Sequence, residues 1–509
     1  CYTEYLPDMD AVNKMLTAIT VEPTAIVGVN IKFDLNYLHV NGFDTRKFAQ
    51  AIDLQHMYYL EHGKKFASMD QMAEFYGFAL KDDKIKDLIK SGTPMQDIAP
   101  AIIDPYLRHD IDVTSKLFDV LWKDTALQNI ASRTTLVLHE IEANGLSIDK
   151  RKLYGLHTEM SEKRATALDV CKKIANEYFP DEYKIASYKS GRLLNQLLFG
   201  HPVSFKKKEK VGVFKNGNDK MALVDQVEVI PAIMEPSDVL RPLEIATYTD
   251  TLGYSMSGDI IKRIATELGK EGKYGMVRTR RKQYLDAVLE IRALSTTLDR
   301  YTTKIGAYLS ATDGGKVHPT YNQSATATGR LSSTNPNAQN MPPVIDDLIT
   351  CDVGEIRVKA DFSQLEVGFA AYLSQDAQLL ADLNEGTDIH AATGEQAGFT
   401  NMDSSTRRTI KAVNFAAIYG GSPRGTAAQT GIPLATVERI HKAFFDRYWE
   451  LKVKFDADFA ALDCLPVAYH RYEGNLKLKI AYDTTMTGRK YYFNQYPKTK
   501  WGTQQIIGQ

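Results

Sequence analysis

Four side chains that recur at every fourth position have types that suit the binding of a nucleotide. They lie in RRTIKAVNFAAIYGG, residues 407–421, which predicts one helix ending at its pair of glycines. Residues four apart turn only about 40° on a helix of 3.6 residues per turn, so the row shares one face. Cations can neutralise phosphates and aromatic rings can stack on a base, whereas an aromatic stripe packed into a core leaves the cations unexplained. The row comprises Arg407, Lys411, Phe415 and Tyr419.

A carboxylate ahead of another predicted helix is a candidate ligand for a divalent cation. The sequence alternates as a strand does through Ile356 and Val358 up to Asp361, and its period then changes to that of a helix. Mg²⁺ favours one or two carboxylates together with phosphate oxygens of a substrate. The structural alternative is a place near the helix start, where S-x-x-E ending at Glu366 has the form of a capping box.

A polar loop precedes this segment. Residues 326–343 read TATGRLSSTNPNAQNMPP, and their glycine, proline, serine and asparagine content predicts irregular backbone. Hydroxyls, amides and one arginine suit contacts to sugar and phosphate or to a minor groove.

Together the three segments resemble the family A DNA polymerases. ATATGRLSS with PNAQN is similar to the family's palm loop, KADFSQLE to its motif A, RRTIKAVNFAAIYG to its motif B, and DIHAATG to the start of its fingers. They stand in the family's order, and residues 188–200 and 296–306 look like thumb segments. The resemblance implies template-directed extension of a primer with deoxynucleotides, by phosphoryl transfer at two Mg²⁺ ions per active site.

The resemblance also implies roles for single residues in motif A. Asp361 would be catalytic and would bind metal together with the carbonyl group of Phe362. Glu366 would close against a ribose 2′-hydroxyl and so favour deoxynucleotides. Gln364 would lie beside the nascent base pair.

Further implied roles fall on the fingers. His390, Arg407 and Lys411 match positions that grip the incoming triphosphate, with Lys411 also catalytic. Phe415 matches the ring that packs on the sugar and base, and its phenyl group implies discrimination against dideoxynucleotides. Tyr419 matches a tyrosine beside the template base. The implied DNA contacts are Thr328, Arg330, Asn337 and Gln339, with Arg330 in the minor groove at the primer end.

Residues near the N-terminus resemble two motifs of the proofreading 3′–5′ exonucleases of the DnaQ-like type. NIKFD, with Asp34, is similar to the second motif, and YLRHDIDVT to the third. The resemblance implies that Asp34 and Asp110 bind metal and that Tyr106 orients the attacking water. A buried tyrosine on a helix is the structural alternative.

Two motifs of these families are not found in the sequence. The first exonuclease motif, with its Asp-x-Glu pair, is expected upstream of Cys1, and the second metal-binding carboxylate of the palm has no counterpart after Gly421. We therefore expect an incomplete or split polymerase, with a second polypeptide as one source of the missing palm. The alternatives are a non-catalytic nucleic-acid-binding remnant and a free-standing 3′–5′ exonuclease, which explains residues 1–128 alone.

The expected fold is a multidomain α/β and α+β protein. An RNase H-like exonuclease domain would occupy residues 1–128 and a mostly helical thumb with basic loops residues 129–318. Part of the palm would occupy residues 319–375, and the fingers residues 376–509.

Composition adds few constraints. The formal net charge is −1, no apolar run is long enough to span a bilayer, and four scattered cysteines favour a reduced compartment. We expect a cytoplasmic protein of a bacterium or a phage-infected cell, with phage origin favoured. Two basic clusters, predicted as loops, can reach a duplex backbone or simply be solvated. They are Lys206, Lys207, Lys208, Lys210, Lys215 and Lys220, and Lys270, Lys273, Arg278, Arg280, Arg281 and Lys282.

Overall fold

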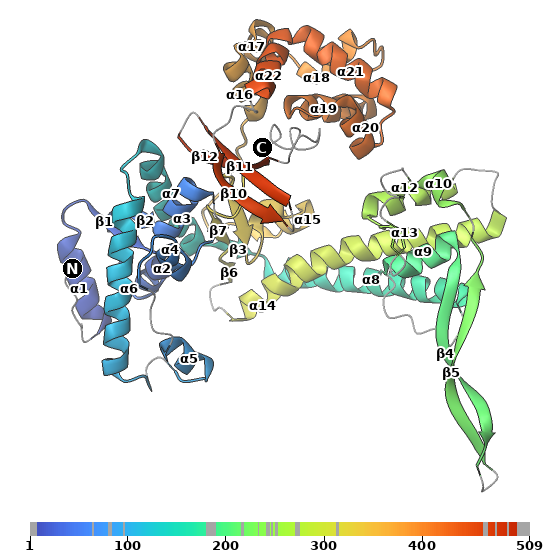
Figure 1. Cartoon of the computed structure of the whole chain (residues 1–509), viewed down its shortest axis with the longest axis horizontal. Helices are drawn as coiled ribbons and strands as arrows, with labels where there is room; N and C mark the ends of the chain where they lie inside the picture. The colour runs from blue at the N-terminus through green and yellow to red at the C-terminus, as the bar shows by residue number, and fades with distance from the viewer. Residues whose placement is uncertain are drawn as a thin grey trace. The chain divides into compact units, whose positions relative to one another are not determined.

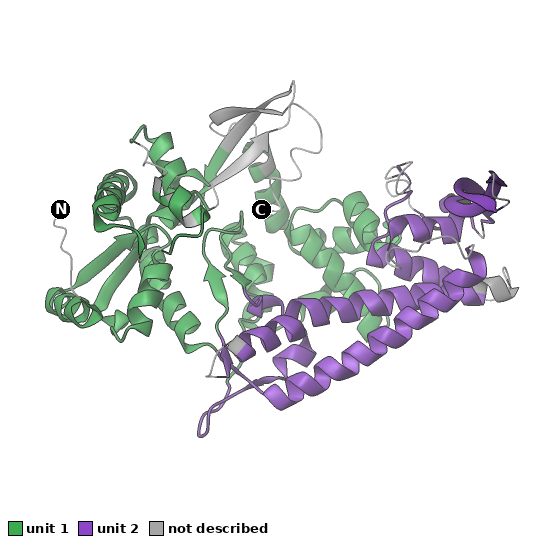
Figure 2. Ribbon diagram, turned by 90° about the horizontal axis from the view of Figure 1, so that it is seen from below, with its two compact units in different colours: residues 1–145, 318–334, 358–509 green, residues 146–317, 335–357 purple. Residues whose placement is uncertain are grey.

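The computed structural model divides the chain into two units (Figure 2). Unit 1 comprises residues 1–145, 318–334 and 358–509, and unit 2 comprises residues 146–317 and 335–357. The described residues are 8–63, 66–79, 84–94, 97–179, 190–214, 218–232, 234–240, 245, 248–249, 253–269, 275–311, 315–461, 467–473, 476–485 and 488–495. No described helix is long and apolar enough to cross a membrane.

Unit 1 opens with a parallel pair of strands, β1 (Thr24–Gly28) and β2 (Phe48–Asp53). Helix α2 (Lys32–Val40) follows β1 directly. Helix α6 (Pro100–Leu121) packs on β1, and α7 (Ala126–Asn144) packs on β2. The remaining helices of this region are α1 (Met9–Ile19), α3 (Leu54–His62), α4 (Met69–Phe75) and α5 (Lys84–Lys90).

Helix α7 ends at a glycine. Gly145 has a φ of 64° and donates its backbone N–H to the carbonyl of Ile141 at 3.1 Å. A positive φ is available to glycine without the steric cost that a Cβ atom brings, so this residue can close the helix.

A bundle of helices forms the C-terminal part of unit 1. Helices α18, α19 and α21 pack on one another, and Phe444 and Tyr448 are fully buried in the core beside α16 and α17. Asp382 is buried and accepts hydrogen bonds from Arg447 and Tyr448, both at 2.8 Å. The Arg447 side chain is partly exposed, whereas loss of either partner would leave a buried carboxylate incompletely paired. The helices are α16 (Leu365–Ser374), α17 (Ala377–Asn384), α18 (Ile389–Gln396), α19 (Ser404–Ile418), α20 (Pro423–Thr430), α21 (Leu434–Arg447) and α22 (Trp449–Ala461).

Unit 1 also contains two antiparallel sheets. The first pairs β7 (Thr320–Asn322) with β8 (Ser332–Thr334), and β8 lies within residues 326–343, which were expected to be irregular. The second has the order β10-β11-β12. Its strands are β10 (Val467–Glu473), β11 (Leu476–Thr484) and β12 (Lys490–Gln495).

The strand predicted to end at Asp361 is not formed. Residues 355–362 have no regular structure, and the side chains of Ile356 and Val358 are 86% and 78% exposed. A strand needs a neighbour that completes its hydrogen-bond ladder, and no described residue pairs with this segment.

The predicted capping box is also wrong. Helix α16 begins at Leu365, so its N-cap is Gln364, which has a φ of 53° and makes no side-chain capping bond. Ser363 lies one position outside the cap, and its hydroxyl is therefore not at the position that a capping box requires.

Two long helices dominate unit 2 (Figure 1). Helix α8 (Lys150–Tyr178) packs along α13 (Gly275–Thr297), and one π-helical turn at Leu298–Thr302 links α13 to α14 (Thr303–Ala311). Shorter helices are α9 (Gly191–Phe199), α10 (Pro236–Val239), α12 (Gly258–Gly269) and α15 (Pro343–Asp346), and β3 (Leu146–Ile148) lies between β6 (Lys316–Val317) and β9 (Ile349–Thr350) in one sheet.

The two basic clusters are not loops where the structure describes them. The first lies on an antiparallel hairpin of β4 (His201–Val213) and β5 (Asp219–Ile230). The second contributes residues 280–282 to α13. Alternating apolar residues in the hairpin outweigh its charge, because Val203 and Phe205 bury their side chains against the helices. Lys215, Lys270 and Lys273 lie outside the described residues.

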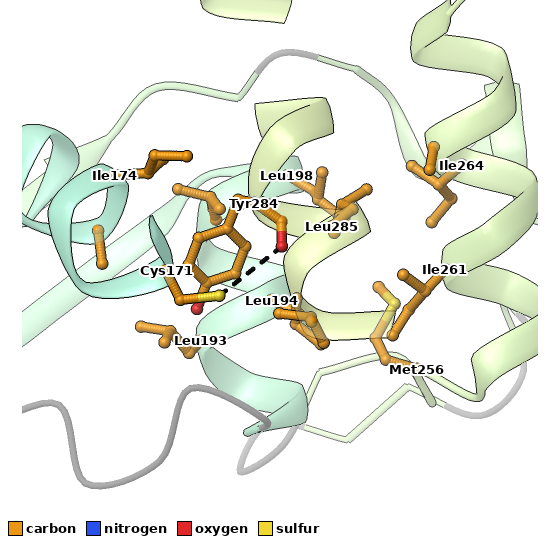
Figure 3. Close-up of a cluster of buried hydrophobic side chains, with 14 of the residues drawn as sticks. Cys171, Ile174, Leu193, Leu194, Leu198, Met256, Ile261, Ile264, Tyr284 and Leu285 are labelled. Carbon is orange, nitrogen blue, oxygen red and sulfur yellow. Dashed lines mark hydrogen bonds between the residues drawn. The ribbon is translucent and has the colours of Figure 1, made fainter. Parts of the chain in front are cut away.

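The largest core of unit 2 surrounds Tyr284 and Leu285 of α13, which are fully buried (Figure 3). Leu194 and Leu198 of α9 and Ile261 of α12 enclose them. Cys171 of α8 lies in the same core, with its Sγ 3.9 Å from the carbonyl oxygen of Tyr284. Burial raises the pKa of the Cys171 thiol to about 12.

Thiol modification should therefore separate two cysteines of unit 2. The thiolate is the reactive form, so buried Cys171 should resist a maleimide at pH 7.5 in the folded protein, whereas exposed Cys351 should react. Peptide mass spectrometry reads each site, and denaturant should make the two react alike. Equal modification under native conditions would contradict the core packing.

Candidate functional site

Helix α19 carries the predicted row on its surface. Asp403 caps the helix by accepting the backbone N–H of Thr406 at 2.7 Å, and Tyr419 and Gly420 end it as predicted. The face of the helix towards the bundle buries Ile410, Val413, Asn414 and Ala417. In the row itself Arg407, Lys411 and Tyr419 are exposed and Phe415 is half-buried. Three members of the row therefore lie on the surface, and Phe415 packs partly against the core of the bundle.

Phe415 is the centre of a small cationic and aromatic group. The Nζ atom of Lys411 lies 5.7 Å from the centroid of its ring, within the range of a cation–π interaction. The ring of His390, on α18, lies 5.7 Å from the ring of Phe415. Two segments far apart in sequence thus place an ammonium group, a phenyl ring and an imidazole side by side.

Arg407 is held by a carboxylate at the start of α18. Its Nε and Nη2 atoms each lie 2.8 Å from Oδ2 of Asp388. Oδ1 of Asp388 accepts the backbone N–H groups of His390 and Ala391, at 3.0 and 3.2 Å. Burial acts to raise the pKa of Asp388, but the hydrogen bonds from Arg407 and the two amides outweigh it and lower the pKa. Exposed ion pairs contribute about 0–1 kcal/mol, so Arg407 can exchange this partner for a phosphate at little cost.

His390 is buried and its tautomer is set by Asn414 of α19. The Nδ2 atom of Asn414 donates to Nδ1 of His390 at 3.2 Å and to Oγ1 of Thr393 at 3.0 Å. Thr393 uses its own proton on the carbonyl of Ile389 at 2.7 Å, which fixes the amide orientation. Nδ1 of His390 is therefore an acceptor, and a neutral ring carries its proton on Nε2.

Sequence reasoning missed both Asn414 and Asp388 as positioning residues. Asn414 interrupts the apolar side of α19 next to Phe415, and a buried amide on such a side is the signal that identifies it. Asp388 directly precedes a helix, where an acidic N-cap is common and draws no attention.

The far end of the row meets two further predicted residues. The carboxylate of Glu366, in the first turn of α16, forms an ion pair with Arg330 and accepts a hydrogen bond from the hydroxyl of Tyr419. Burial and the bond to Glu366 raise the pKa of Tyr419. The structure thus brings Arg330, Glu366 and Tyr419 together.

The other predicted polymerase residues are exposed or half-buried. Asp361, Phe362 and Gln364 are exposed on or beside the irregular segment, and Thr328 is exposed in unit 1. In unit 2 the side chains of Asn337 and Gln339 are half-buried and exposed, and Asn337 accepts the backbone N–H of Gln339 at 3.2 Å.

The predicted exonuclease residues lie on two helices. Asp34 is in the first turn of α2, and partial burial of its carboxylate raises its pKa despite a backbone hydrogen bond. Tyr106 and Asp110 are half-buried, one turn apart on α6.

A metal site is not formed by the described residues alone. Among them no group of three or more His, Cys, Asp or Glu side chains could hold a metal ion, around Asp361 or around Asp34. Asp361 and Asp34 are thus candidate ligands, and the described residues gather no further carboxylate or imidazole ligands into a group around either of them.

Comparison with known proteins matches residues 253–506 to the model of DNA polymerase family A. The chain is similar to DNA polymerase I of Rhizobium leguminosarum, with 26% identity over 87% of the chain and 39% of that protein. It is also similar to DNA polymerase I of Borreliella burgdorferi, with 25% identity over 84% of the chain and 42% of that protein. The chain thus spans about two fifths of the length of these relatives.

A solved structure shares the fold. The match is the POL domain of Pol1 from M. smegmatis in complex with DNA primer-template and dNTP, with a TM-score of 0.66 and 19% sequence identity. It covers 99% of this chain and 75% of that chain. The mixed α/β fold is therefore that of a polymerase domain.

The pKa of His390 yields a test of the site. Burial is the main cause that lowers it, and the positive charges of Arg407 and Lys411 act in the same direction against Asp388. The ring should be neutral at pH 7 with its proton on Nε2, which long-range ¹H–¹⁵N NMR spectra report directly. A charged imidazole at pH 7, or a proton on Nδ1, would contradict the assigned contacts.

The same shift has a consequence for stability. The unfolded chain takes up a proton at His390 near pH 6.5, about the ordinary value, whereas the folded chain resists it. The free energy of unfolding should therefore decrease as the pH falls below about 6.5, because only the unfolded chain binds this proton readily. In His390→Gln the decrease that is due to His390 should be absent.

Proposed function

The chain belongs to family A of the DNA polymerases, and from this premise we propose that it binds a deoxynucleoside triphosphate along α19 for template-directed extension of a DNA primer. The observation that carries the proposal is the surface row of Arg407, Lys411, Phe415 and Tyr419, with His390 beside it. The fold match supports it, since that relative was solved with DNA primer-template and dNTP.

The triphosphate lies at the cationic end of the row. Arg407 exchanges Asp388 for phosphate oxygens, and Lys411 adds a second positive charge one helical turn further on. His390 donates from Nε2, because Asn414 occupies its other nitrogen. Charge-assisted hydrogen bonds of this kind are about twice as strong as neutral ones.

The sugar and base lie towards the aromatic end. Each four-residue step along α19 rises about 6 Å, so phosphates and base reach different members of the row. Phe415 packs on the sugar and base, and Glu366 closes against the 2′ position. Tyr419 lies beside the template base, and its bond to Glu366 supports a shared role at this end.

The DNA contacts of the proposal are Arg330 at the primer end, together with Thr328, Gln364, Asn337 and Gln339. Arg330 reaches this site through its ion pair with Glu366. An exposed pair contributes about 0–1 kcal/mol, so Arg330 can turn to DNA without a large penalty.

Family A polymerases generally use divalent metal ions. Asp361 and the Phe362 carbonyl remain the proposed contribution of this segment, and neither has further carboxylate or imidazole ligands gathered around it among the described residues. Helix α16 carries an exposed apolar stripe. We infer that another segment of the polymerase, or a second polypeptide, packs on this stripe. Its members are 48–58% exposed: Leu365, Phe369, Tyr372 and Leu373.

A 3′–5′ proofreading site at Asp34, Tyr106 and Asp110 is the second part of the proposal. Its support is the sequence pattern and the placement of Tyr106 and Asp110 one turn apart on α6, with Asp34 directly after β1. Both carboxylates would bind metal, and Tyr106 would orient water.

The nucleotide grip is tested by a pair of arginine variants. Arg407→Ala should raise the dissociation constant for a complementary deoxynucleotide roughly 10- to 100-fold, because a hydrogen-bonded charge on phosphate is lost. Arg408→Ala is the matched control, since Arg408 is also exposed on α19 but lies about 100° round the helix. Binding is measured with a primer-template whose primer lacks a 3′-hydroxyl, so no extension occurs.

Equal effects of the two variants would contradict the assignment of the row. A wild-type chain that binds the primer-template but no nucleotide would instead favour a nucleic-acid-binding remnant.

The sugar contact of Phe415 is tested by Phe415→Tyr. The added hydroxyl supplies a hydrogen-bond partner in place of the 3′-hydroxyl that a dideoxynucleotide lacks. The preference for deoxy- over dideoxynucleotide, measured as a ratio of dissociation constants or of incorporation, should fall about 2- to 10-fold. Phe445→Tyr, at another half-buried ring of the same core cluster, should leave the ratio unchanged. An unchanged ratio in Phe415→Tyr would refute the contact.

A further inference from the structure

The β4–β5 hairpin is a two-stranded ribbon with two different faces. Its strands have 13 and 12 residues, which corresponds to about 40 Å of length. Figure 1 shows the strands running away from the helices of unit 2. Successive side chains of a strand point to opposite faces, and residues directly paired across the strands share a face.

One face of the ribbon turns towards the helices at its base. Val203 and Ile230 are buried in the core around Tyr284, and Phe205 is buried next to them along the strand. The same face also carries Glu228, opposite Val203, and Lys207 and Glu209 further out, a net charge of −1 from one lysine and two glutamates.

The opposite face combines a row of lysines with a row of aliphatic side chains. Lys206, Lys208 and Lys210 alternate along β4 and are exposed. Their direct partners on β5 are Asp225, Leu223 and Met221, so three lysines stand against one aspartate among these pairs, and Lys210 also forms an ion pair with Asp219. The aliphatic row is 50–72% exposed and comprises Met221, Leu223, Val227 and Val229.

We propose that this lysine and aliphatic face binds the sugar–phosphate backbone and groove of duplex DNA. Lysines two residues apart in a strand repeat about every 6.8 Å, so their ammonium groups can reach separate phosphates. A two-stranded ribbon fits the major groove, which is about 12 Å wide. The aliphatic row then contacts deoxyribose and thymine methyl groups, as apolar side chains do in DNA grooves.

Charge favours DNA over a protein as the occupant. Lysine is depleted from the centre of protein–protein interfaces, whereas lysine neutralisation of phosphates drives DNA binding. The identification of DNA as the partner rests on the proposed polymerase function. The identification of the binding face rests only on the residues of the ribbon.

Adjacent lysines on opposite faces provide the experiment. Lys208→Gln and Lys207→Gln each remove one positive charge from neighbouring positions of β4, so their overall electrostatic effect is the same. Lys210 is less suitable, because it forms an ion pair with Asp219 at 2.5 Å. The full chain is titrated with a fluorescent primer-template duplex at several salt concentrations, and log K is plotted against log [salt].

Lys208→Gln should make the salt slope shallower by about 0.9, because one phosphate contact is lost, and Lys206→Gln with Lys208→Gln by up to about 1.8. Lys207→Gln should keep the wild-type slope. Protection of Cys171, in the core that anchors the ribbon, checks that each variant is folded.

A wild-type salt slope in Lys208→Gln would overturn the proposal, and it is the result expected if this face binds a protein. A slope that changes equally in Lys207→Gln and Lys208→Gln would also overturn it. Neither result bears on nucleotide binding, which the arginine pair on α19 tests separately. If Arg407→Ala and Arg408→Ala affect nucleotide binding equally while Lys208→Gln still changes the salt slope, the proposal for the ribbon stands and the proposal for the nucleotide site does not.

Discussion

The buried amide of Asn414 is the interaction on which the candidate nucleotide site depends. It joins α19 to α18 through His390 and Thr393, and its side chain is fully buried. Its Nδ2 atom finds both partners on α18, whereas its Oδ1 atom has no hydrogen-bond partner among the described residues. Loss of the two Nδ2 contacts would leave that buried N–H group unpaired too, which favours the register of the two helices that makes them. That register places the His390 ring beside Phe415 and Arg407 beside Asp388.

The contacts around this amide leave the binding groups ready for a charged ligand. His390 is kept neutral with a proton on Nε2, and Lys411 remains exposed over the Phe415 ring. Arg407 is oriented by a weak surface pair, which holds its guanidinium in place without a large cost for exchange. The lysine face of the β4–β5 ribbon uses the same chemistry, cations beside apolar groups, on a strand scaffold. Each scaffold sets the spacing of its cations, which is about 6 Å for every four residues on the helix and about 6.8 Å for every two residues on the strand.

The local sequence pattern was sufficient to predict a helix where residue spacing and a terminal glycine both mark it. The four-residue row and the glycine pair predicted α19 and its end, because helical hydrogen bonds are made within the segment. The strand before Asp361 could not be predicted this way, since a strand depends on a partner distant in sequence. The lysine hairpin was misjudged because its charge was weighed above the alternation of Val203 and Phe205. The contacts of Asn414 and Asp388 join two helices, and single-sequence periodicity contains no information on such pairs.

The central claim is that the row on α19 binds the nucleotide, and photo-crosslinking tests it most directly. An azido-substituted deoxyadenosine triphosphate would be irradiated with the chain and a primer-template, and the labelled tryptic peptide identified by mass spectrometry. The account predicts label on residues 412–424, AVNFAAIYGGSPR, which contain Phe415 and Tyr419, and loss of that label with excess unlabelled nucleotide. Label confined to other peptides, or label on this peptide that unlabelled nucleotide does not displace, would contradict it.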